Sequence, residues 1–216
     1  KAKISMLQAK EYRLIPNSID CQVFYPENRK QARQRLQLPE NKKIVLFCAA
    51  SKKSIFKDPL CMTETILRLA KKDPEILFIC IGAKAALPAL KAFSIVYLPF
   101  LNDATILADY YRAADVFVHT AKAETFGKTV TEAMACATPV VASRVGGITE
   151  QLIEGKTGEL AETGNAKEMA EKISKILNMK ENEKKIIDQN AAEQGKKYAM
   201  ENQVNALLKW YREIRE

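Results

Sequence analysis

Six short apolar runs recur along the chain, and segments with helical spacing separate them. The runs at residues 43–49 and 75–81 are apolar at almost every position, which is typical of parallel strands buried on both faces. Three others lie at residues 95–98, 114–118 and 139–142, and the last, at residues 157–160, is short and more polar. This alternation predicts an α/β fold built on a doubly wound parallel sheet. Open sheets of this kind bind ligands at the carboxyl ends of their strands.

The composition predicts one globular domain in a reducing compartment. With 216 residues, 47% hydrophobic and 28% charged, the chain is long enough for one well-cored domain. Its five cysteines form no C-x-x-C pair, and three lie inside apolar runs, as expected of reduced core thiols. No apolar run approaches the roughly 18 residues of a membrane span, and no signal peptide is visible. We expect a cytoplasmic protein, and this expectation is compatible with peripheral contact with the inner face of the membrane.

The net charge is +8, from 34 basic and 26 acidic residues. The lysines are spread over many segments, which favours anionic ligands or surfaces in general. A nucleic-acid binder needs a basic stripe interleaved with aromatic residues, so we expect no nucleic acid as a partner. The dehydrogenase and P-loop classes are also excluded, because the sequence contains neither a G-x-G-x-x-G fingerprint nor a Walker A lysine loop.

Residues 121–143 join two predicted strands through a loop and one amphipathic helix, which makes a βαβ unit. Phe126-Gly127 interrupts the loop, so we expect the helix to begin near Lys128. The amides of Phe126, Gly127 and Lys128 then lack partners inside the helix and face outward. A helix start of this kind binds anions.

Two carboxylates flank this helix start: Glu124 in the loop before it, and Glu132 about one turn inside. Carboxylates offer only acceptors, so they suit adjacent sugar hydroxyls far better than phosphate. A diphosphate on the helix amides, with one acid toward each end, predicts a ligand with hydroxyls at both ends. The alternative is a pair of solvated acids near a helix N-terminus, where the macrodipole favours negative charge. Spacing alone leaves both interpretations open.

The surrounding residues carry a family resemblance. Glu124 and Glu132 have seven residues between them and are followed by Ala-Met-Ala-Cys-Ala-Thr-Pro-Val-Val-Ala-Ser and then by Gly146-Gly147. This pattern resembles the signature of the retaining nucleotide-sugar glycosyltransferases of the GT-B fold, group 1 (family 4). The resemblance implies the C-terminal, donor-binding half of such an enzyme, with a Rossmann-like fold.

The same resemblance implies a division of the chain. Residues 1–13 correspond to the end of a missing N-terminal domain or its linker, and residues 14–195 to the nucleotide-sugar-binding domain. Residues 196–216 correspond to a last helix that packs toward the N-terminal half. The apolar stripe of that helix is equally compatible with packing on its own domain.

The resemblance also implies roles for single residues. Glu124, which holds the donor sugar, and Lys57, which neutralises the diphosphate, are the catalytic residues, and Glu132 binds the ribose diol. The other donor-binding residues are Phe126, Gly127 and Lys128 at the helix start, Pro99, Phe100 and Leu101 around the base, Gly146 and Gly147 beside the phosphates, and Lys52 or Lys53 as a second cation. Two positions depart from the family: its loop arginine has no counterpart here, and Ala137 replaces a glycine. A lysine is a point charge and not a fork, so its grip on phosphate is weaker.

His119 is the only histidine, at the end of the strand before the central loop. We expect a structural role for it, because no second histidine and no paired cysteines are present to build a zinc site with it. The sequence also has no Asp-x-Asp pair. We therefore expect a reaction without metal or cofactor, in which lysine and helix amides balance the charge of the leaving diphosphate.

The predicted function is transfer of a sugar from a nucleotide-diphosphate sugar to an acceptor hydroxyl with retention. The resemblance implies a hexosyltransferase-like enzyme of polysaccharide, lipopolysaccharide or glycolipid assembly. Its acceptor, a sugar or a lipid-linked sugar, binds through the N-terminal half, so we expect this part alone to bind nucleotide and to transfer little or nothing. A hypothesis from another class is a GT-B-like module that has lost catalysis and binds a nucleotide or a partner.

Overall fold

The computed structural model describes residues 13–48, 56–82, 90 and 92–214. At its centre lies one sheet of six strands that pair in parallel, in the order β3-β2-β1-β4-β5-β6. The chain builds from β1 outward to β3, then crosses back to place β4 beside β1, so the strand order reverses between β1 and β4. The predicted doubly wound sheet is confirmed. Its strands are β1 (Ile44–Cys48), β2 (Leu77–Ile81), β3 (Ile95–Leu98), β4 (Val116–His119), β5 (Val140–Ser143) and β6 (Gly158–Ala161).

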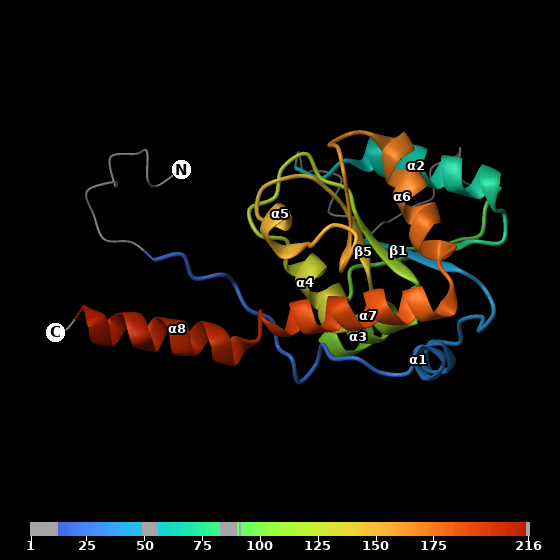
Figure 1. Ribbon diagram of the computed structural model, residues 1–216. Helices are drawn as coiled ribbons and strands as arrows, with labels where there is room; N and C mark the ends of the chain where they lie inside the picture. The colour runs from blue at the N-terminus through green and yellow to red at the C-terminus, as the bar shows by residue number, and fades with distance from the viewer. Residues whose placement is uncertain (1–12, 49–55, 83–89, 91, 215–216) are drawn as a thin grey trace.

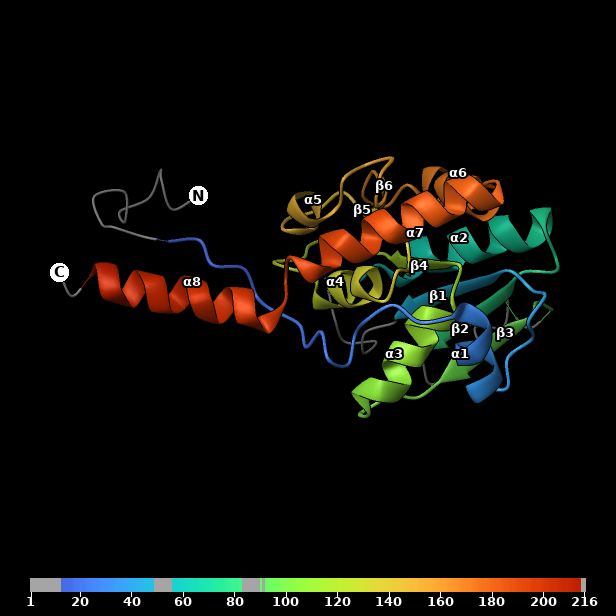
Figure 2. The same cartoon turned by 60° about the horizontal axis from the view of Figure 1, so that its bottom comes forward.

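Helices cover both faces of this sheet (Figures 1 and 2). α2 and α6 pack together on one face, whereas α3 and α4 lie over the other, where α7 packs on α4 and α1 on α3. The helices are α1 (Arg29–Arg35), α2 (Pro59–Lys72), α3 (Ala104–Ala113), α4 (Lys128–Ala135), α5 (Ile148–Gln151), α6 (Ala166–Leu177), α7 (Glu181–Lys196) and α8 (Met200–Glu213).

The strands β1 and β2 are apolar throughout because they are buried on both sides of the sheet. In β1, Ile44 and Leu46 belong to the core under α3 and α4, whereas Val45 and Phe47 belong to the core under α2 and α6. Successive side chains of a strand point to opposite faces. A sheet that lies between two helical layers therefore requires an apolar residue at every position, which accounts for the continuous runs in the sequence.

α8 stands apart from the sheet and lies beside the segment that begins at Arg13 (Figures 1 and 2). The hydroxyl of Ser18 donates to Gln203 Oε1 at 2.7 Å, and Arg13 forms an ion pair with Glu213. No residue of α8 is buried. Among the described residues the apolar stripe of α8 therefore buries no side chain on the sheet domain, and packing toward an N-terminal half stays a prediction. The exposed apolar residues of α8 include Val204, Leu208 and Tyr211.

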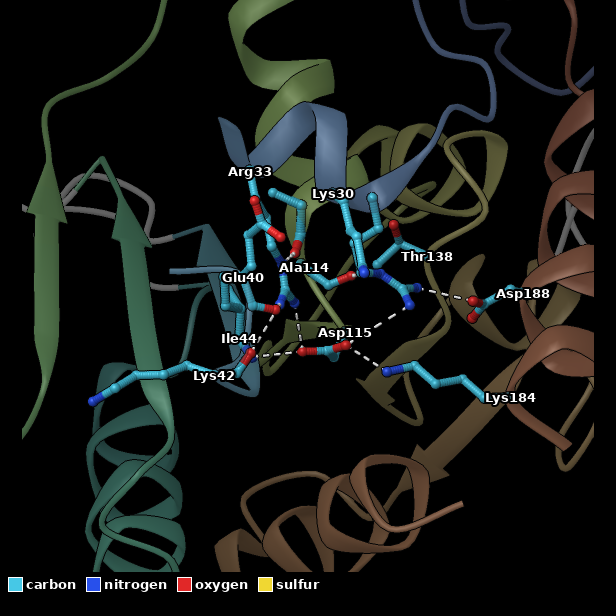
Figure 3. Close-up of polar contacts among 12 residues, drawn as sticks. Lys30, Arg33, Glu40, Lys42, Ile44, Ala114, Asp115, Thr138, Lys184 and Asp188 are labelled. Carbon is cyan, nitrogen blue, oxygen red and sulfur yellow. Dashed lines mark hydrogen bonds and ion pairs between the residues drawn. The ribbon is translucent and has the colours of Figure 1, made fainter. Parts of the chain in front are cut away.

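A buried carboxylate ties the amino-terminal ends of the central strands to two helices (Figure 3). Asp115, just before β4, accepts hydrogen bonds from Arg33 of α1 at 2.8 Å and from the amide of Ile44 in β1 at 2.7 Å. Lys184 of α7 forms an ion pair with the same carboxylate. The cluster holds α1, β1, β4 and α7 together at the end of the sheet opposite to the one where ligands are expected.

Candidate functional site

The loops that follow β1 and β4 are joined at the carboxyl edge of the sheet. Lys57 forms an antiparallel β-bridge with Ala121, and the amide of Lys122 donates to the carbonyl of Phe56 at 2.7 Å. Because β1 and β4 are neighbours where the strand order reverses, this junction lies at the topological switch point of the sheet. Open α/β sheets bind their ligands in the crevice at that point.

The junction brings three side chains together. Lys57 Nζ lies 3.0 Å from Glu124 Oε2 and 2.6 Å from His119 Nε2, and His119 Nε2 lies 3.4 Å from the same carboxylate oxygen. The side chain of His119 is 1% exposed, whereas those of Lys57 and Glu124 are 25% and 21% exposed. The two predicted catalytic residues therefore form one cluster that stays partly open to solvent. The third member, His119, was expected to be structural only.

The environment sets the charge of this cluster. Its contacts with His119 and with Lys57 lower the pKa of Glu124 to about 2, although partial burial acts in the opposite direction. Burial lowers the pKa of His119 below its ordinary value of 6.5, and the Lys57 ammonium acts in the same sense, against the opposing effect of Glu124. At neutral pH the cluster thus holds an ionised carboxylate beside an uncharged imidazole. Glu124 is suited to accept hydrogen bonds, as a sugar hydroxyl requires, and not to donate a proton.

Gly146 and Gly147 support the Glu124 loop through the close approach of two backbones. A Cβ on Gly146 would lie 1.8 Å from the carbonyl oxygen of Glu124, and one on Gly147 would lie 2.4 Å from that of Thr125. No side chain fits there. The contact found in the structure is with the loop that carries Glu124, and the expected place of this glycine pair beside the phosphates of a ligand stays a prediction.

α4 begins at Lys128 with Gly127 as its N-cap, as predicted, and Gly127 has a φ of +86°. This left-handed conformation is open to glycine at little cost. The first amides of a helix have no partner within it, so the start of α4 presents N–H groups directly after the loop of Glu124. The carbonyl of Phe126 accepts a hydrogen bond from the side chain of Gln151, which stabilises this turn. The predicted start of this helix is therefore confirmed, and anion binding there stays a prediction.

Glu132 lies inside α4 and is partly buried. Tyr111, a fully buried residue of α3, donates its hydroxyl to Glu132 Oε2 at 3.2 Å. Burial raises the pKa of Glu132 above its ordinary value, although Tyr111 and Lys128 act in the other direction. The alternative of two solvated acids therefore fits neither residue, since Glu124 is ion-paired and Glu132 is desolvated.

The remaining predicted residues lie along the same edge or outside the described part of the chain. Pro99, Phe100 and Leu101 follow the carboxyl end of β3, where the amide of Gly82 donates to the carbonyl of Leu98 at 2.9 Å. Phe100 is largely exposed. Lys52 and Lys53 fall outside the described residues.

The described residues contain no group of three or more histidine, cysteine, aspartate and glutamate side chains placed to hold a metal ion. No helix within the described ranges has the length and apolar character needed to cross a membrane.

Comparison with known proteins places this geometry in a family. Residues 28–194 match the family "Glycosyl transferases group 1". A D-inositol 3-phosphate glycosyltransferase of Mycobacterium tuberculosis (strain ATCC 25177 / H37Ra) is 30% identical over 207 residues, which cover 90% of this chain and 42% of that protein. The chain spans less than half the length of the curated relatives it matches.

Two solved structures show the same fold. Sucrose-phosphate synthase from Thermosynechococcus elongatus has a TM-score of 0.79 and 26% identity, and the match covers 99% of this chain and 55% of that one. Anabaena Alr3699/HepE in complex with UDP-glucose has a TM-score of 0.77 and 20% identity, with 96% and 60% covered. The chain belongs to the group 1 glycosyltransferases, and its sheet is the Rossmann-like sheet of that GT-B class.

Proposed function

We propose that this chain is the donor-binding half of a hexosyltransferase-like enzyme that transfers a sugar from a nucleotide-diphosphate sugar to an acceptor hydroxyl with retention. The observation that carries the proposal is the contact of Lys57 with Glu124 at the switch point of the sheet, directly before the start of α4. A cation, a row of free amides and an ionised acceptor lie there within a single loop region. Together they match a ligand in which a diphosphate adjoins a sugar.

Each group has a task in this reaction. The bond between the anomeric carbon and the diphosphate oxygen breaks, and a bond from that carbon to the acceptor oxygen forms. Lys57 and the amides at the start of α4 stabilise the charge that develops on the leaving diphosphate. The departing phosphate takes the proton of the acceptor hydroxyl, so no separate base is required in this half. Glu124 holds the hydroxyls of the donor sugar, and Glu132, positioned by Tyr111, holds the ribose diol.

A thermal-shift screen against UDP-, GDP- and ADP-glucose tests donor binding. A ligand at 100 times its Kd stabilises the folded chain by about 2.7 kcal/mol, so the preferred nucleotide sugar raises Tm. Lys57→Met is expected to weaken that ligand about tenfold or more, the effect of one lost charge-assisted hydrogen bond. Lys122→Met is the matched control, because it removes an exposed lysine of the facing loop. Equal effects of the two substitutions would contradict the proposed role of Lys57.

Transfer itself is measured with a radiolabelled donor. In a protein that contains both halves, Glu124→Gln is expected to reduce kcat by about a hundredfold or more, because the donor sugar loses its positioning contact. The 216-residue chain alone is expected to bind nucleotide and to transfer almost nothing. Substantial transfer by this chain would refute the division of labour between the two halves.

The finer proposals concern the rest of the protein. We infer that the acceptor is a sugar or a lipid-linked sugar of polysaccharide, lipopolysaccharide or glycolipid assembly, that it meets the donor through the N-terminal half, and that no metal takes part. The exposed apolar face of α8 supports the contact with that half. A non-catalytic binding module remains the second candidate, favoured by the absence of the family's loop arginine. Nucleotide binding without measurable transfer by the parent protein that contains both halves would favour it over the enzyme.

A further inference from the structure

Among the described residues, one ring nitrogen of His119 has no hydrogen-bond partner, whereas the other faces the predicted catalytic lysine. The nitrogen without a partner is Nδ1, which is buried. Its Nε2 lies 2.6 Å from Lys57 Nζ. A histidine retained only for packing would gain from satisfying both nitrogens, because buried polar groups without a partner are costly. The arrangement favours the single contact with Lys57.

The chemistry of that contact determines the state of the ring. A lysine ammonium has three donors and no acceptor, so Nε2 must accept and the ring proton resides on Nδ1. Nε2 then has no proton to donate to Glu124, although Glu124 Oε2 is only 3.4 Å away. His119 lies close enough to the carboxylate to influence it, but the hydrogen bond of its Nε2 is the one with Lys57.

The ammonium divides its donors between the loops. One N–H meets His119 at the end of β4 and one meets Glu124, and no other residue in the described part of the chain accepts from the third, which is available to a ligand. We propose that His119 is a positioning residue of the donor site: its Nε2 fixes the Lys57 ammonium so that its remaining donor meets the diphosphate of the nucleotide sugar. This inference rests on the donor-binding function proposed above.

The contacts with His119 and Glu124 restrict the side chain of Lys57, which would otherwise be flexible. An arginine grips a diphosphate with a rigid fork, whereas a lysine is a point charge on a stem with many rotamers. Without His119, the ammonium would keep its ion pair with Glu124 and lose the acceptor that directs it. The nucleotide diphosphate would then bind a poorly oriented cation.

Binding measurements on four variants test the inference. The ligand is whichever of UDP, GDP and ADP binds the parent chain best by calorimetry. His119→Leu is expected to weaken it about tenfold, whereas His119→Gln, which keeps an acceptor on a side chain of similar reach, restores most of the affinity. In a Lys57→Met background, His119→Leu should cause no further loss, since residues that act through one contact are not additive. Ile173→Val, in the core under α6, controls for general destabilisation.

The single histidine also provides a readout that needs no ligand. In a chain without added histidines, the one imidazole signal of a ¹H–¹³C NMR titration belongs to His119. Its pKa is expected below 6.5, and Lys57→Met should raise it because a neighbouring cation is removed. Addition of the nucleoside diphosphate should raise it as well, because negative charge arrives beside Lys57.

The outcomes separate the two hypotheses. If no nucleoside diphosphate binds the parent chain, the donor-binding function fails, and the inference about His119 fails with it. If the parent binds and Lys57→Met weakens binding, the donor site stands. The inference about His119 is then refuted if His119→Leu leaves affinity unchanged, or if its loss is equally large in the Lys57→Met background. If Lys57→Met leaves the imidazole pKa unchanged, that result alone would refute the inference about His119.

Discussion

Asp115→Asn is expected to lower the free energy of unfolding by about 3 kcal/mol, near the lower end of the range for breaking a buried ion pair. The side chains of Asp115 and Arg33 are only 8% and 5% exposed. Asparagine keeps the shape and can still accept from the amide of Ile44, so the loss is mainly one of charge. Arg33 and Lys184 would remain beside a neutral group in a poorly solvated site (Figure 3).

The lower end of that range follows from the other contacts of Arg33. Its guanidinium donates to the carbonyls of Ala113, Glu40 and Lys42 at 2.9, 2.7 and 2.9 Å. These bonds survive the substitution, so most of its N–H groups stay satisfied. A domain of this kind is stable by only about 5–15 kcal/mol, and the loss is therefore a large share of the total.

Urea unfolding at pH 7, followed by far-UV circular dichroism, measures the effect. Asp188→Asn is the matched control: its partner is the partly exposed Arg29, and burial raises the pKa of Asp188, so its charge contributes less. We expect a change below about 1 kcal/mol for that control, typical of a pair that is partly screened. A loss below about 1 kcal/mol for Asp115→Asn as well would refute the reasoning.

The pH dependence gives a second check on Asp115. Burial by itself raises the pKa of this carboxyl, but Lys184, Arg29 and Arg33 together outweigh burial and hold it below its ordinary value of 3.8. A carboxyl with a lowered pKa in the folded state contributes stability above its unfolded pKa and loses that contribution as pH falls through the folded value. The difference in the free energy of unfolding between the parent chain and Asp115→Asn should stay constant down to about pH 5. It should become smaller below pH 3.8. A gap that widens in acid would contradict this assignment.

Two further predictions concern the backbone near the site. Gly146→Ala is expected to abolish nucleotide binding and to lower Tm, because the new Cβ would lie 1.8 Å from the carbonyl oxygen of Glu124 and the residue has a φ of +44°. Calorimetry measures the binding and a melting curve measures Tm. Values equal to those of the parent chain would contradict the contact between Gly146 and the loop of Glu124. Ala137→Gly is expected to raise the free energy of unfolding by about 0.5–1 kcal/mol, because Ala137 follows α4 with a φ of +60°, where glycine is favoured. Urea unfolding measures this gain, and a loss of stability would show that Ala137 is not strained.

Much of the fold was predictable from the sequence because it depends on neighbours along the chain. Continuous apolar runs identify strands buried on both faces, and Phe126-Gly127 marks the point where α4 begins. The spacing of Glu124 and Glu132 placed one acid before that point and one inside the helix, as the structure has them. These features follow from local periodicity and turn chemistry, which remain the same whatever the rest of the chain does.

The contacts between the side chains of the site could not be predicted from local periodicity and turn chemistry. Lys57 is 62 positions from His119 and 67 from Glu124, and the residues meet only because β1 and β4 are neighbours in the sheet. His119 was therefore expected to be structural, and the support that Gly146 gives to the loop of Glu124 was not predicted. A lone histidine in a strand gives no signal of which side chain will face it.

The sequence by itself determined which segments form strands and helices, and which acids flank the start of α4. The tertiary structure alone decided that Lys57 pairs with Glu124, that Glu132 is desolvated by burial and contacted by Tyr111, and that several cations surround Asp115. The physical reason is range. Propensity and periodicity act over a few residues, whereas a charge or a hydrogen bond acts on whatever the strand order brings within a few ångströms, at distances and degrees of burial that no local pattern records.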